Sequence, residues 1–257
     1  MIPAPILLHR DGAVANLRFN RPEALNAINQ ELAELLEHHL RSLSADPSIR
    51  VVVLSGAGKG FTGGGDLSVF RGASSFPEAA DVLIGPLHRA VMILREMPQI
   101  VVASLHGAVA GAGLSFAMLA DLAIAADTIR MNMAYARIQA VPDCGGSWAL
   151  ARLVGARKAL EIALLSDTIG ADEALLLGLV NRVVPEPDLA AETAAIANRL
   201  ARQSPASARG IRDLLRQSLQ TRLPDQLDAE RAAFRAAAAQ PEFADAIAGF
   251  FARNAKP

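Results

Sequence analysis

The chain has 257 residues, of which 52% are hydrophobic and 20% are charged, a balance that suits one large globular domain, or a domain with a helical appendage. The net charge of −1 provides no broad basic field to attract nucleic acid or an anionic membrane. The single cysteine, Cys144, excludes an internal disulfide and is typical of a reducing compartment, so we expect a cytoplasmic protein. Residues 1–12 lack the basic and apolar regions of a signal peptide.

The first elements in chain order are two strands and a helix. The expected strands at 6–9 and 13–19 flank Asp11-Gly12, which is a hairpin turn signal. Pro22 ends the second strand, and leucines at helical spacing predict a helix over 29–43. This segment therefore predicts a β-hairpin followed by an amphipathic helix.

A similar succession of strands and helices follows, with some drift. The expected elements are strands at 51–54, 100–102, 122–125 and 129–133 and a helix at 78–97 that is interrupted at Gly85-Pro86. Repetition of strand, strand and helix predicts a wound α/β core.

Helices dominate the chain after Gly145. The expected helices are 147–153, 156–165, 172–177, 187–201, 205–220, 223–239 and 241–253, and one strand is expected at 180–184. Prolines or acidic residues stand where these helices begin. We expect the core to occupy residues 1–195 and a separate helical region to occupy residues 196–257.

Two glycine-rich turns each follow a buried strand. One is Gly63-Gly64-Gly65, and the other is Gly111-Ala112-Gly113, which opens an apolar helix at 114–119. Such a turn leaves backbone N–H groups unpaired at the positive end of a helix macrodipole, and its small residues let another molecule approach closely. It can bind a phosphate or stabilise an oxyanion, or it can be a tight packing corner. The presence of two similar turns favours the functional interpretation.

Other motifs do not support nucleotide, metal or membrane chemistry. Gly58-Lys59 lacks the flanking residues of a P-loop, and Phe116 stands where a dinucleotide fingerprint needs a small residue. His38 and His39 are adjacent on a helix and point in different directions, so no metal site is predicted. Residues 101–120 are long and uncharged enough to span a membrane, but their glycines, serines and histidine favour a buried strand and helix.

Three further side chains have alternative interpretations. Ser115 and His106 could form a nucleophile and its base, although no G-x-S-x-G elbow frames the serine and His106 also suits a packed strand end. Asp143 precedes a glycine pair, where it either caps the next helix or carries chemistry. Cys144 is either an activated thiol or a small buried residue.

Several segments resemble the enoyl-CoA hydratase/isomerase, or crotonase, superfamily in both order and spacing. They are Asn20–Ala27 (NRPEALNA), Gly60–Leu67 (GFTGGGDL), Gly111–Ser115, Pro142-Asp143 and Phe243–Phe251 (FADAIAGFF). The resemblance covers essentially the whole chain. It implies an α/β fold built as a spiral of strand-strand-helix units, with a C-terminal helical trimerisation region. It also implies a homotrimer or a dimer of trimers that acts on an acyl-CoA thioester, with no cofactor apart from the CoA of the substrate.

The resemblance further implies the site residues. Gly65 and Ala112, from the two glycine turns, supply the N–H groups of an oxyanion hole. The wall for the CoA is formed by Ala24, Leu25, Gly63, Gly64, Asp66 and Leu67. Further substrate-binding residues are Gly111, Ser115, Tyr135, Pro142 and Trp148, of which Ser115, Tyr135 and Trp148 shape the acyl pocket.

The chain departs from the hydratases of this family at two positions. Ser115 and Tyr135 stand where hydratases have catalytic glutamates, and the pKa values of serine and tyrosine hydroxyls are too high for them to act as bases near neutral pH. Asp143 resembles the acid of enoyl-CoA isomerases, which implies that it moves a proton from C2 to C4 of a 3-enoyl thioester. The alternatives are a residual hydratase that uses Asp143, a dehalogenase-like enzyme with Asp143 as nucleophile, and a scaffold that binds acyl-CoA without turnover.

Overall fold

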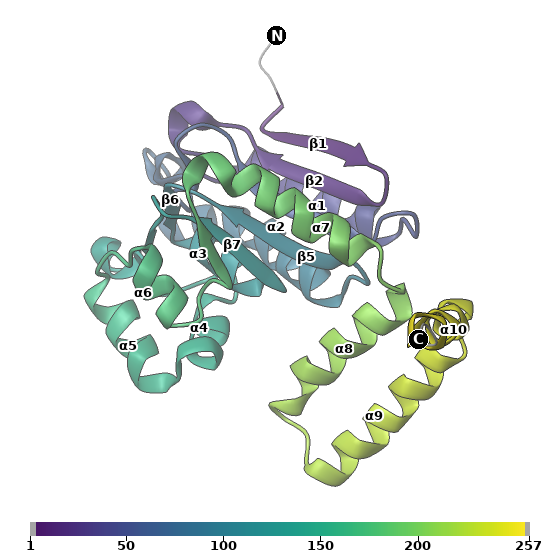
Figure 1. Ribbon diagram of the computed structural model, residues 1–257. Coiled ribbons are helices and arrows are strands. Elements are labelled where there is room, and N and C mark those ends of the chain that lie inside the picture. The colour runs from purple at the N-terminus through teal and green to yellow at the C-terminus, as the bar shows by residue number, and fades with distance from the viewer. Residues whose placement is uncertain (1–3, 255–257) are drawn as a thin grey trace.

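The computed structural model describes residues 4–254 and shows a chain that winds through successive strand-strand-helix units (Figure 1). The first three units are β1 (Ile6–Asp11), β2 (Val14–Phe19) and α1 (Gln30–Ser44); β3 (Val51–Gly56), β4 (Gly60–Thr62) and α2 (Phe76–Glu96); and β5 (Ile100–Leu105), β6 (Ala108–Ala110) and α3 (Ala112–Leu119). The remaining core elements are β7 (Leu122–Ala126), β8 (Arg130–Asn132), α4 (Gly146–Val154), α5 (Ala156–Leu165), α6 (Ala171–Leu176), β9 (Arg182–Val184) and α7 (Leu189–Ala201). The predicted spiral of ββα units is confirmed.

The strands form two sheets, because the two strands of each later unit enter different sheets. The larger sheet has the order β1-β2-β3-β5-β7-β9, in which β1 is antiparallel to β2 and the other neighbours are parallel. The smaller sheet has the order β4-β6-β8 and is parallel. Since the carboxyl ends of parallel strands meet at one edge, the turns that follow β4 and β6 are brought together.

The larger sheet is covered on both faces, which explains its continuous apolar strands. In β3, Val52 and Leu54 belong to the main core with α1 and α2, whereas Val51 and Val53 pack with α7. Figure 1 shows α7 lying across one face of this sheet and α1 and α2 lying behind it. The larger sheet is therefore buried between two layers of helices.

Two expectations about this part of the chain need correction. The strands β4 and β6 are absent from the sequence prediction, which treats their residues as loop. The predicted interruption at Gly85-Pro86 is wrong, because α2 is continuous and Pro86 is buried within it. Leu83, Leu87 and Ala90 continue the buried stripe on both sides of the proline, so core packing outweighs the one hydrogen bond that it removes.

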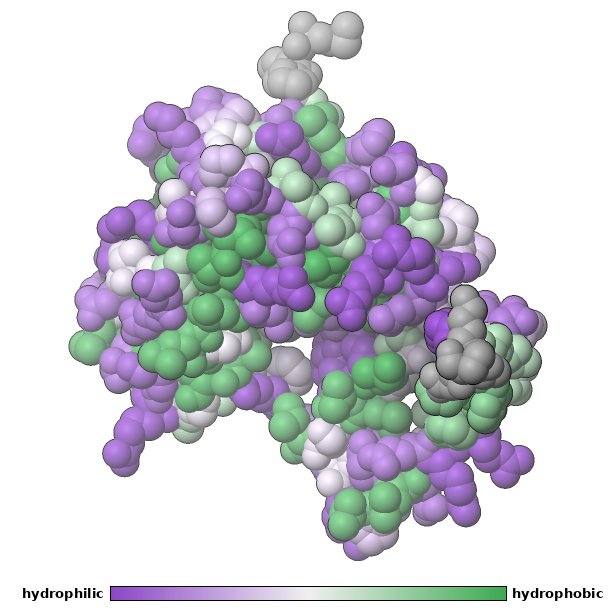
Figure 2. Space-filling model, in the orientation of Figure 1, coloured by the Kyte–Doolittle hydropathy of each residue, from purple (hydrophilic) through white to green (hydrophobic). Residues whose placement is uncertain are grey.

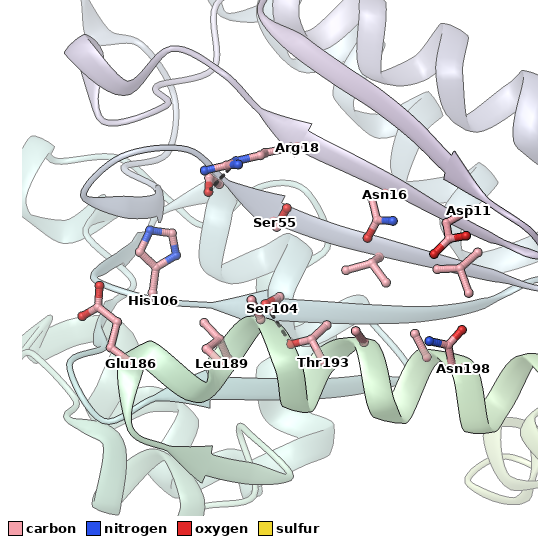
Figure 3. A pocket seen from close by; sticks show the side chains of 16 residues that line it. Asp11, Asn16, Arg18, Ser55, Ser104, His106, Glu186, Leu189, Thr193 and Asn198 are labelled. Atoms are coloured by element: carbon pink, nitrogen blue, oxygen red, sulfur yellow. Dashed lines mark hydrogen bonds between the residues drawn. The ribbon is translucent and has the colours of Figure 1, made fainter.

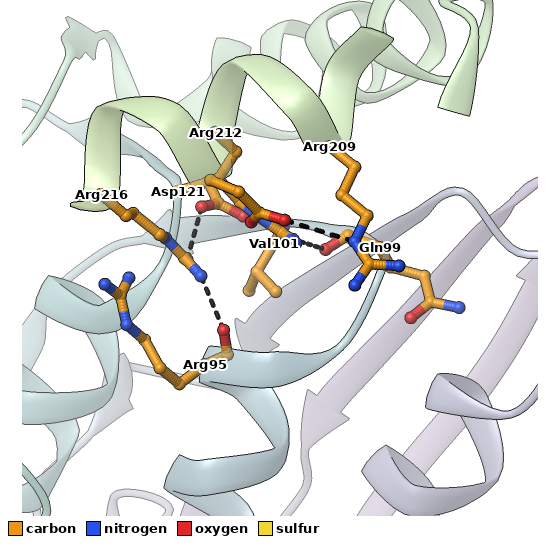
Figure 4. Close-up of polar contacts among 8 residues, drawn as sticks. Arg95, Gln99, Val101, Asp121, Arg209, Arg212 and Arg216 are labelled. Atoms are coloured by element: carbon orange, nitrogen blue, oxygen red, sulfur yellow. Dashed lines mark hydrogen bonds and ion pairs between the residues drawn. The ribbon is translucent and has the colours of Figure 1, made fainter. Parts of the chain in front are cut away.

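The last three helices stand apart from the core (Figure 1). They are α8 (Pro205–Ser218), α9 (Leu223–Ala238) and α10 (Pro241–Asn254). Arginines of α8 attach it to the core: the Arg212 guanidinium donates to the Gln99 carbonyl at 2.8 Å, and Arg216 donates to Asp121 Oδ1 at 2.6 Å (Figure 4). The predicted boundary after residue 195 falls inside α7 and remains a prediction.

The long apolar stretch that raises the question of a membrane span is divided among three elements. Residues 101–120 form most of β5, then β6 and α3. Within residues 4–254, no helix combines the length and the apolar character needed to cross a membrane.

Candidate functional site

The two glycine turns lie in contact at the ends of the neighbouring parallel strands β4 and β6. Gly64 has a φ of +96°, and a Cβ added to it would lie 2.8 Å from the Ala110 carbonyl oxygen and 3.4 Å from Gly111 Cα. Gly111 also has a positive φ, of +53°. A side chain at position 64 would therefore be strained and would push the turns apart, which explains why glycine stands there.

Each turn presents at least one backbone N–H that donates no hydrogen bond within the described residues. Within residues 4–254, neither the Gly65 N–H nor the Ala112 N–H donates a hydrogen bond, although the adjacent Asp66 and Gly111 N–H groups donate to backbone carbonyls at 2.9 and 3.0 Å. Ala112 is the first residue of α3, so its N–H lies at the positive end of that helix. Two free donors on touching turns are what an oxyanion hole requires.

The loop that precedes α1 is joined to the first glycine turn. Gly63 N–H donates to the Leu25 carbonyl at 2.8 Å, and the Arg21 guanidinium lies 3.0 Å from Asp66 Oδ2. Burial disfavours the Asp66 charge, but hydrogen bonds from Ser68 and Arg21 outweigh it and lower the pKa of this carboxyl. On these segments Leu25 and Leu67 are exposed, and Ala24, which precedes Leu25, is half-buried. Apolar side chains exposed beside two unused amides suit the binding of an extended ligand.

Two buried polar residues that sequence reasoning missed fix this junction. The Asn26 side-chain amide donates to the Ala57 and Gly60 carbonyls at 2.8 and 2.9 Å. The Thr62 hydroxyl donates to the Asn26 carbonyl at 2.8 Å and accepts from Gly64 N–H at 3.1 Å. Both residues lie inside the motifs that carry the family resemblance. The signal that could have identified them is a polar residue within a segment that is expected to be buried.

Asp143 lies in a cluster with Ser115 and Tyr135. The Tyr135 hydroxyl donates to Asp143 Oδ1, and the Ser115 hydroxyl donates to the Asp143 carbonyl at 3.1 Å. The helix-cap interpretation of Asp143 is wrong, because α4 has Gly145 as its N-cap and no side-chain cap. The Asp143 carboxylate is therefore half-buried and engaged by a phenol.

The same cluster touches the second glycine turn through Ser115. Ser115 is fully buried one helical turn after Ala112, and its N–H donates to the Gly111 carbonyl at 3.2 Å. A Cβ added to Gly146 would lie 2.4 Å from Ser115 Oγ, so the start of α4 packs directly on α3. These contacts bring the Asp143 segment against the turn that carries the Ala112 N–H.

The other ionisable groups of the cluster are held in their neutral forms. Burial raises the pKa of the Tyr135 phenol, and the facing Asp143 carboxylate raises it further. Burial and the same carboxylate raise the pKa of the Cys144 thiol, so the activated-thiol interpretation is wrong and Cys144 is a small buried residue. Asp143 thus provides the carboxyl group of the cluster, beside a neutral phenol and a neutral thiol.

His106 has a different environment from Ser115. Its ring lines a polar cavity of about 340 Å³ between α7 and the larger sheet, together with Arg18, Ser55 and Thr193 (Figure 3). His106 Nε2 lies 2.9 Å from the Gly58 carbonyl oxygen, whereas Ser115 bonds to backbone carbonyls. The proposed Ser–His nucleophile pair is therefore wrong.

Two of the predicted residues, Trp148 and Pro142, border separate cavities. The Trp148 ring lies against the guanidiniums of Arg95 and Arg152, 5.0 and 3.9 Å from its centroid, beside a cavity of about 500 Å³ between α4 and α8. Pro142 borders an apolar cavity of about 350 Å³ on α4 and α5. Leu83, which a Cβ on Gly65 would approach to 3.5 Å, borders a hollow of about 290 Å³ beside α2. The structure does not bring Trp148 into the Asp143 cluster, and its place in an acyl pocket remains a prediction.

Comparison with known proteins finds one matching family and similar solved structures. The model of the enoyl-CoA hydratase/isomerase family matches residues 9–256. The 1,2-epoxyphenylacetyl-CoA isomerase of Escherichia coli K12 is 32% identical over 97% of this chain and 96% of its own length. The crystal structure of an enoyl-CoA hydratase from Polaromonas sp. JS666 has a TM-score of 0.91 at 31% identity, and covers 96% of this chain and 97% of that one. A Thermobifida fusca protein solved in complex with acetoacetyl-CoA has a TM-score of 0.85 at 31% identity, over 92% of this chain and 95% of that one.

Proposed function

Because the chain belongs to the enoyl-CoA hydratase/isomerase family, we propose that it is an acyl-CoA isomerase that shifts the double bond of an enoyl-CoA thioester. The observation that carries this choice is the cluster around Asp143. A single carboxylate there is held by the Tyr135 hydroxyl, beside the turn with the free Ala112 N–H. One acid is sufficient to move a double bond, whereas hydration also needs a second group to activate water.

The proposed reaction uses the backbone for electrostatic stabilisation and Asp143 for proton transfer. The thioester oxygen accepts hydrogen bonds from the Gly65 and Ala112 N–H groups. Asp143 removes a proton from C2 of a 3-enoyl thioester, so that negative charge develops on the held oxygen. The same acid then returns a proton to C4. Each oxyanion donor contributes about 3 kcal/mol to transition-state stabilisation.

We place the CoA along the joined loops before α1 and after β4. Exposed Leu25 and Leu67 offer apolar contact for the pantetheine chain, and the ion pair between Arg21 and Asp66 fixes the two loops relative to each other. The acyl chain enters between the glycine turns towards the hollow beside Leu83. The acetoacetyl-CoA bound by the Thermobifida fusca relative supports a thioester as the ligand.

The test is a panel of 2-enoyl, 3-enoyl and aryl thioesters followed by mass spectrometry and ultraviolet absorbance. Isomerisation of a 3-enoyl-CoA without a change of mass, lost in Asp143→Asn and retained in the surface control Asp228→Asn, is the expected result. Addition of water would instead identify a hydratase, and a trapped ester on Asp143 would identify nucleophilic catalysis. Tight CoA binding with no reaction on the panel would favour the scaffold.

We also propose that α8–α10 form a trimerisation surface. Hydrophobic residues gather along α8 and α9 and over the α4–α6 lobe (Figure 2). The exposed apolar residues of α8–α10 include Ile211, Leu215, Leu219, Phe234, Phe250 and Phe251. An apolar area of this kind marks an interaction surface in most proteins. Sedimentation analysis is expected to find a trimer or a hexamer that dissociates in Phe250→Asp but not in Leu7→Asp, and a monomeric wild type would contradict the proposal.

A further inference from the structure

We propose that Tyr135 is a positioning residue that holds Asp143 by Oδ1, so that Oδ2 alone exchanges the proton with the acyl chain. This inference rests on the proposed isomerase function. It assigns the residue that replaces a hydratase glutamate a specific task, and it predicts the path of the transferred proton.

The first support is the asymmetry of the Asp143 carboxylate. Oδ1 accepts the Tyr135 hydroxyl, whereas no hydroxyl or N–H group of residues 4–254 donates to Oδ2; the Cys144 thiol, a weak donor, is the other side chain that interacts with this carboxyl. The phenol is 9% exposed and the carboxylate is half-buried, so solvent has limited access to their contact. A charge-assisted bond of this kind is stronger than a neutral one and fixes the plane of the carboxyl group.

The second support is that the backbone holds both partners. Tyr135 begins a single 3₁₀ turn bounded by residues in the left-handed region, Ala134 with φ +60° and Gln139 with φ +58°. The backbone N–H of Tyr135 donates to a backbone carbonyl at 2.8 Å, and the backbone carbonyl of Tyr135 accepts from a backbone N–H at 3.0 Å. The Asp143 carbonyl accepts from Ser115 Oγ at 3.1 Å and from Gly146 N–H at 2.8 Å. These contacts fix the backbone segments from which both side chains extend.

The consequence for the reaction follows from counting bonds and electrons. The C2–H bond breaks, its proton moves to Oδ2, and its electron pair forms the C1–C2 double bond as the thioester oxygen becomes negative. The oxygen then re-forms the carbonyl, the C1–C2 pair moves to C2–C3, and the former C3–C4 π pair takes the proton from Oδ2 at C4. The Tyr135 phenol stays protonated, because burial and the facing carboxylate raise its pKa. The proton removed from C2 is therefore the one delivered to C4.

The activity test compares wild type with Tyr135→Phe, which removes one oxygen atom from the side chain. We expect kcat to fall about 10- to 100-fold while KM changes less than about twofold, because carboxylate orientation affects the transition state more than thioester binding. In D₂O, the wild-type product is expected to keep much of the C2 hydrogen at C4, and the variant to lose it to exchange. Unchanged kcat and unchanged direct transfer in a folded Tyr135→Phe would overturn the proposal.

A spectroscopic test works independently of turnover, because Tyr135 is the one tyrosine of the sequence. Tyrosinate absorbance therefore reports this phenol alone, with Asp143 and Cys144 as the ionisable groups that face it. We expect ionisation above the ordinary value of about 10 in wild type, and at lower pH in Asp143→Asn. Identical tyrosinate titration curves in wild type and Asp143→Asn would overturn the proposed hydrogen bond between Tyr135 and Asp143. Wild type without isomerase activity but with the expected titration difference would overturn the proposed function and the proton path, while leaving the pair in place.

Discussion

Substitution of Gly64 tests whether contact between the two glycine turns creates the site. In Gly64→Ala, the new Cβ would lie 2.8 Å from the Ala110 carbonyl oxygen, at a φ of +96° that alanine rarely adopts. Strain at such a position is worth about 1–3 kcal/mol, so we expect the free energy of unfolding to fall by about 2–3 kcal/mol. For a chain of this length, that corresponds to a decrease in Tm of about 5–10 °C.

The effect on activity should be larger than the effect on stability. The added methyl group moves the Gly65 N–H relative to the Ala112 N–H, and the loss of one oxyanion donor lowers kcat about 10²–10³-fold. The assay is isomerisation of a 3-enoyl-CoA, accompanied by thermal unfolding. Gly63→Ala is the matched stability control, because its Cβ would lie 3.6 Å from the nearest atom of Leu25 and its φ is not in the left-handed region. A Gly64→Ala protein with wild-type kcat and Tm would refute the argument that these turns must touch.

Other predictions follow from single contacts. Ala112→Pro removes one oxyanion N–H at the first residue of α3, a position where proline is tolerated. We expect kcat to fall about 10²–10³-fold with little loss of Tm, whereas the control Ala112→Gly keeps the N–H and should keep its activity. Arg216→Ala leaves a buried carboxylate without its ion pair, so urea unfolding should show that the free energy of unfolding falls by about 3 kcal/mol. The free energy of unfolding of the exposed control Arg209→Ala should fall by less than about 0.5 kcal/mol, and equal losses would contradict the view that Arg216 attaches α8 to the core. The pKa of Asp66 is lowered in the fold, so the contribution of its contact with Arg21 is complete above the unfolded value of about 3.9 and disappears as the pH falls through the lower folded value. Unfolding measured against pH should therefore be less acid-sensitive in Asp66→Asn than in wild type, and parallel curves would exclude this role.

The fold could be predicted wherever an element is long enough to show a period. The leucine stripe of α1 and the apolar run of β5 gave the correct structures, because each buries a face of known geometry. Strands β4 and β6 have three residues each, which is too short for any periodicity. They are strands because β6 pairs with β4 on one side and with β8 on the other, across long separations in sequence, and single-sequence reasoning has no access to such pairing.

Only part of the site could be predicted, because contacts between segments that are distant in sequence leave no signal in a single sequence. Glycines after buried strands identified the two turns, and the family resemblance pointed to Gly65 and Ala112 within them, but the contact between the turns depends on the β4–β6 pairing. The approach of Tyr135 to Asp143 depends on left-handed backbone at Ala134, which is not a glycine and gives no sequence signal. The pairing of these side chains therefore became visible only in three dimensions.

The most direct measurement of the central claim is a crystal structure of the protein with a bound acyl-CoA that cannot isomerise, such as acetoacetyl-CoA. The account predicts that the thioester oxygen lies about 2.7–3.1 Å from both the Gly65 and the Ala112 nitrogen, with the acyl C2 and C4 facing Asp143 Oδ2. A thioester oxygen that contacts neither nitrogen, or an acyl chain directed away from Asp143, would contradict it.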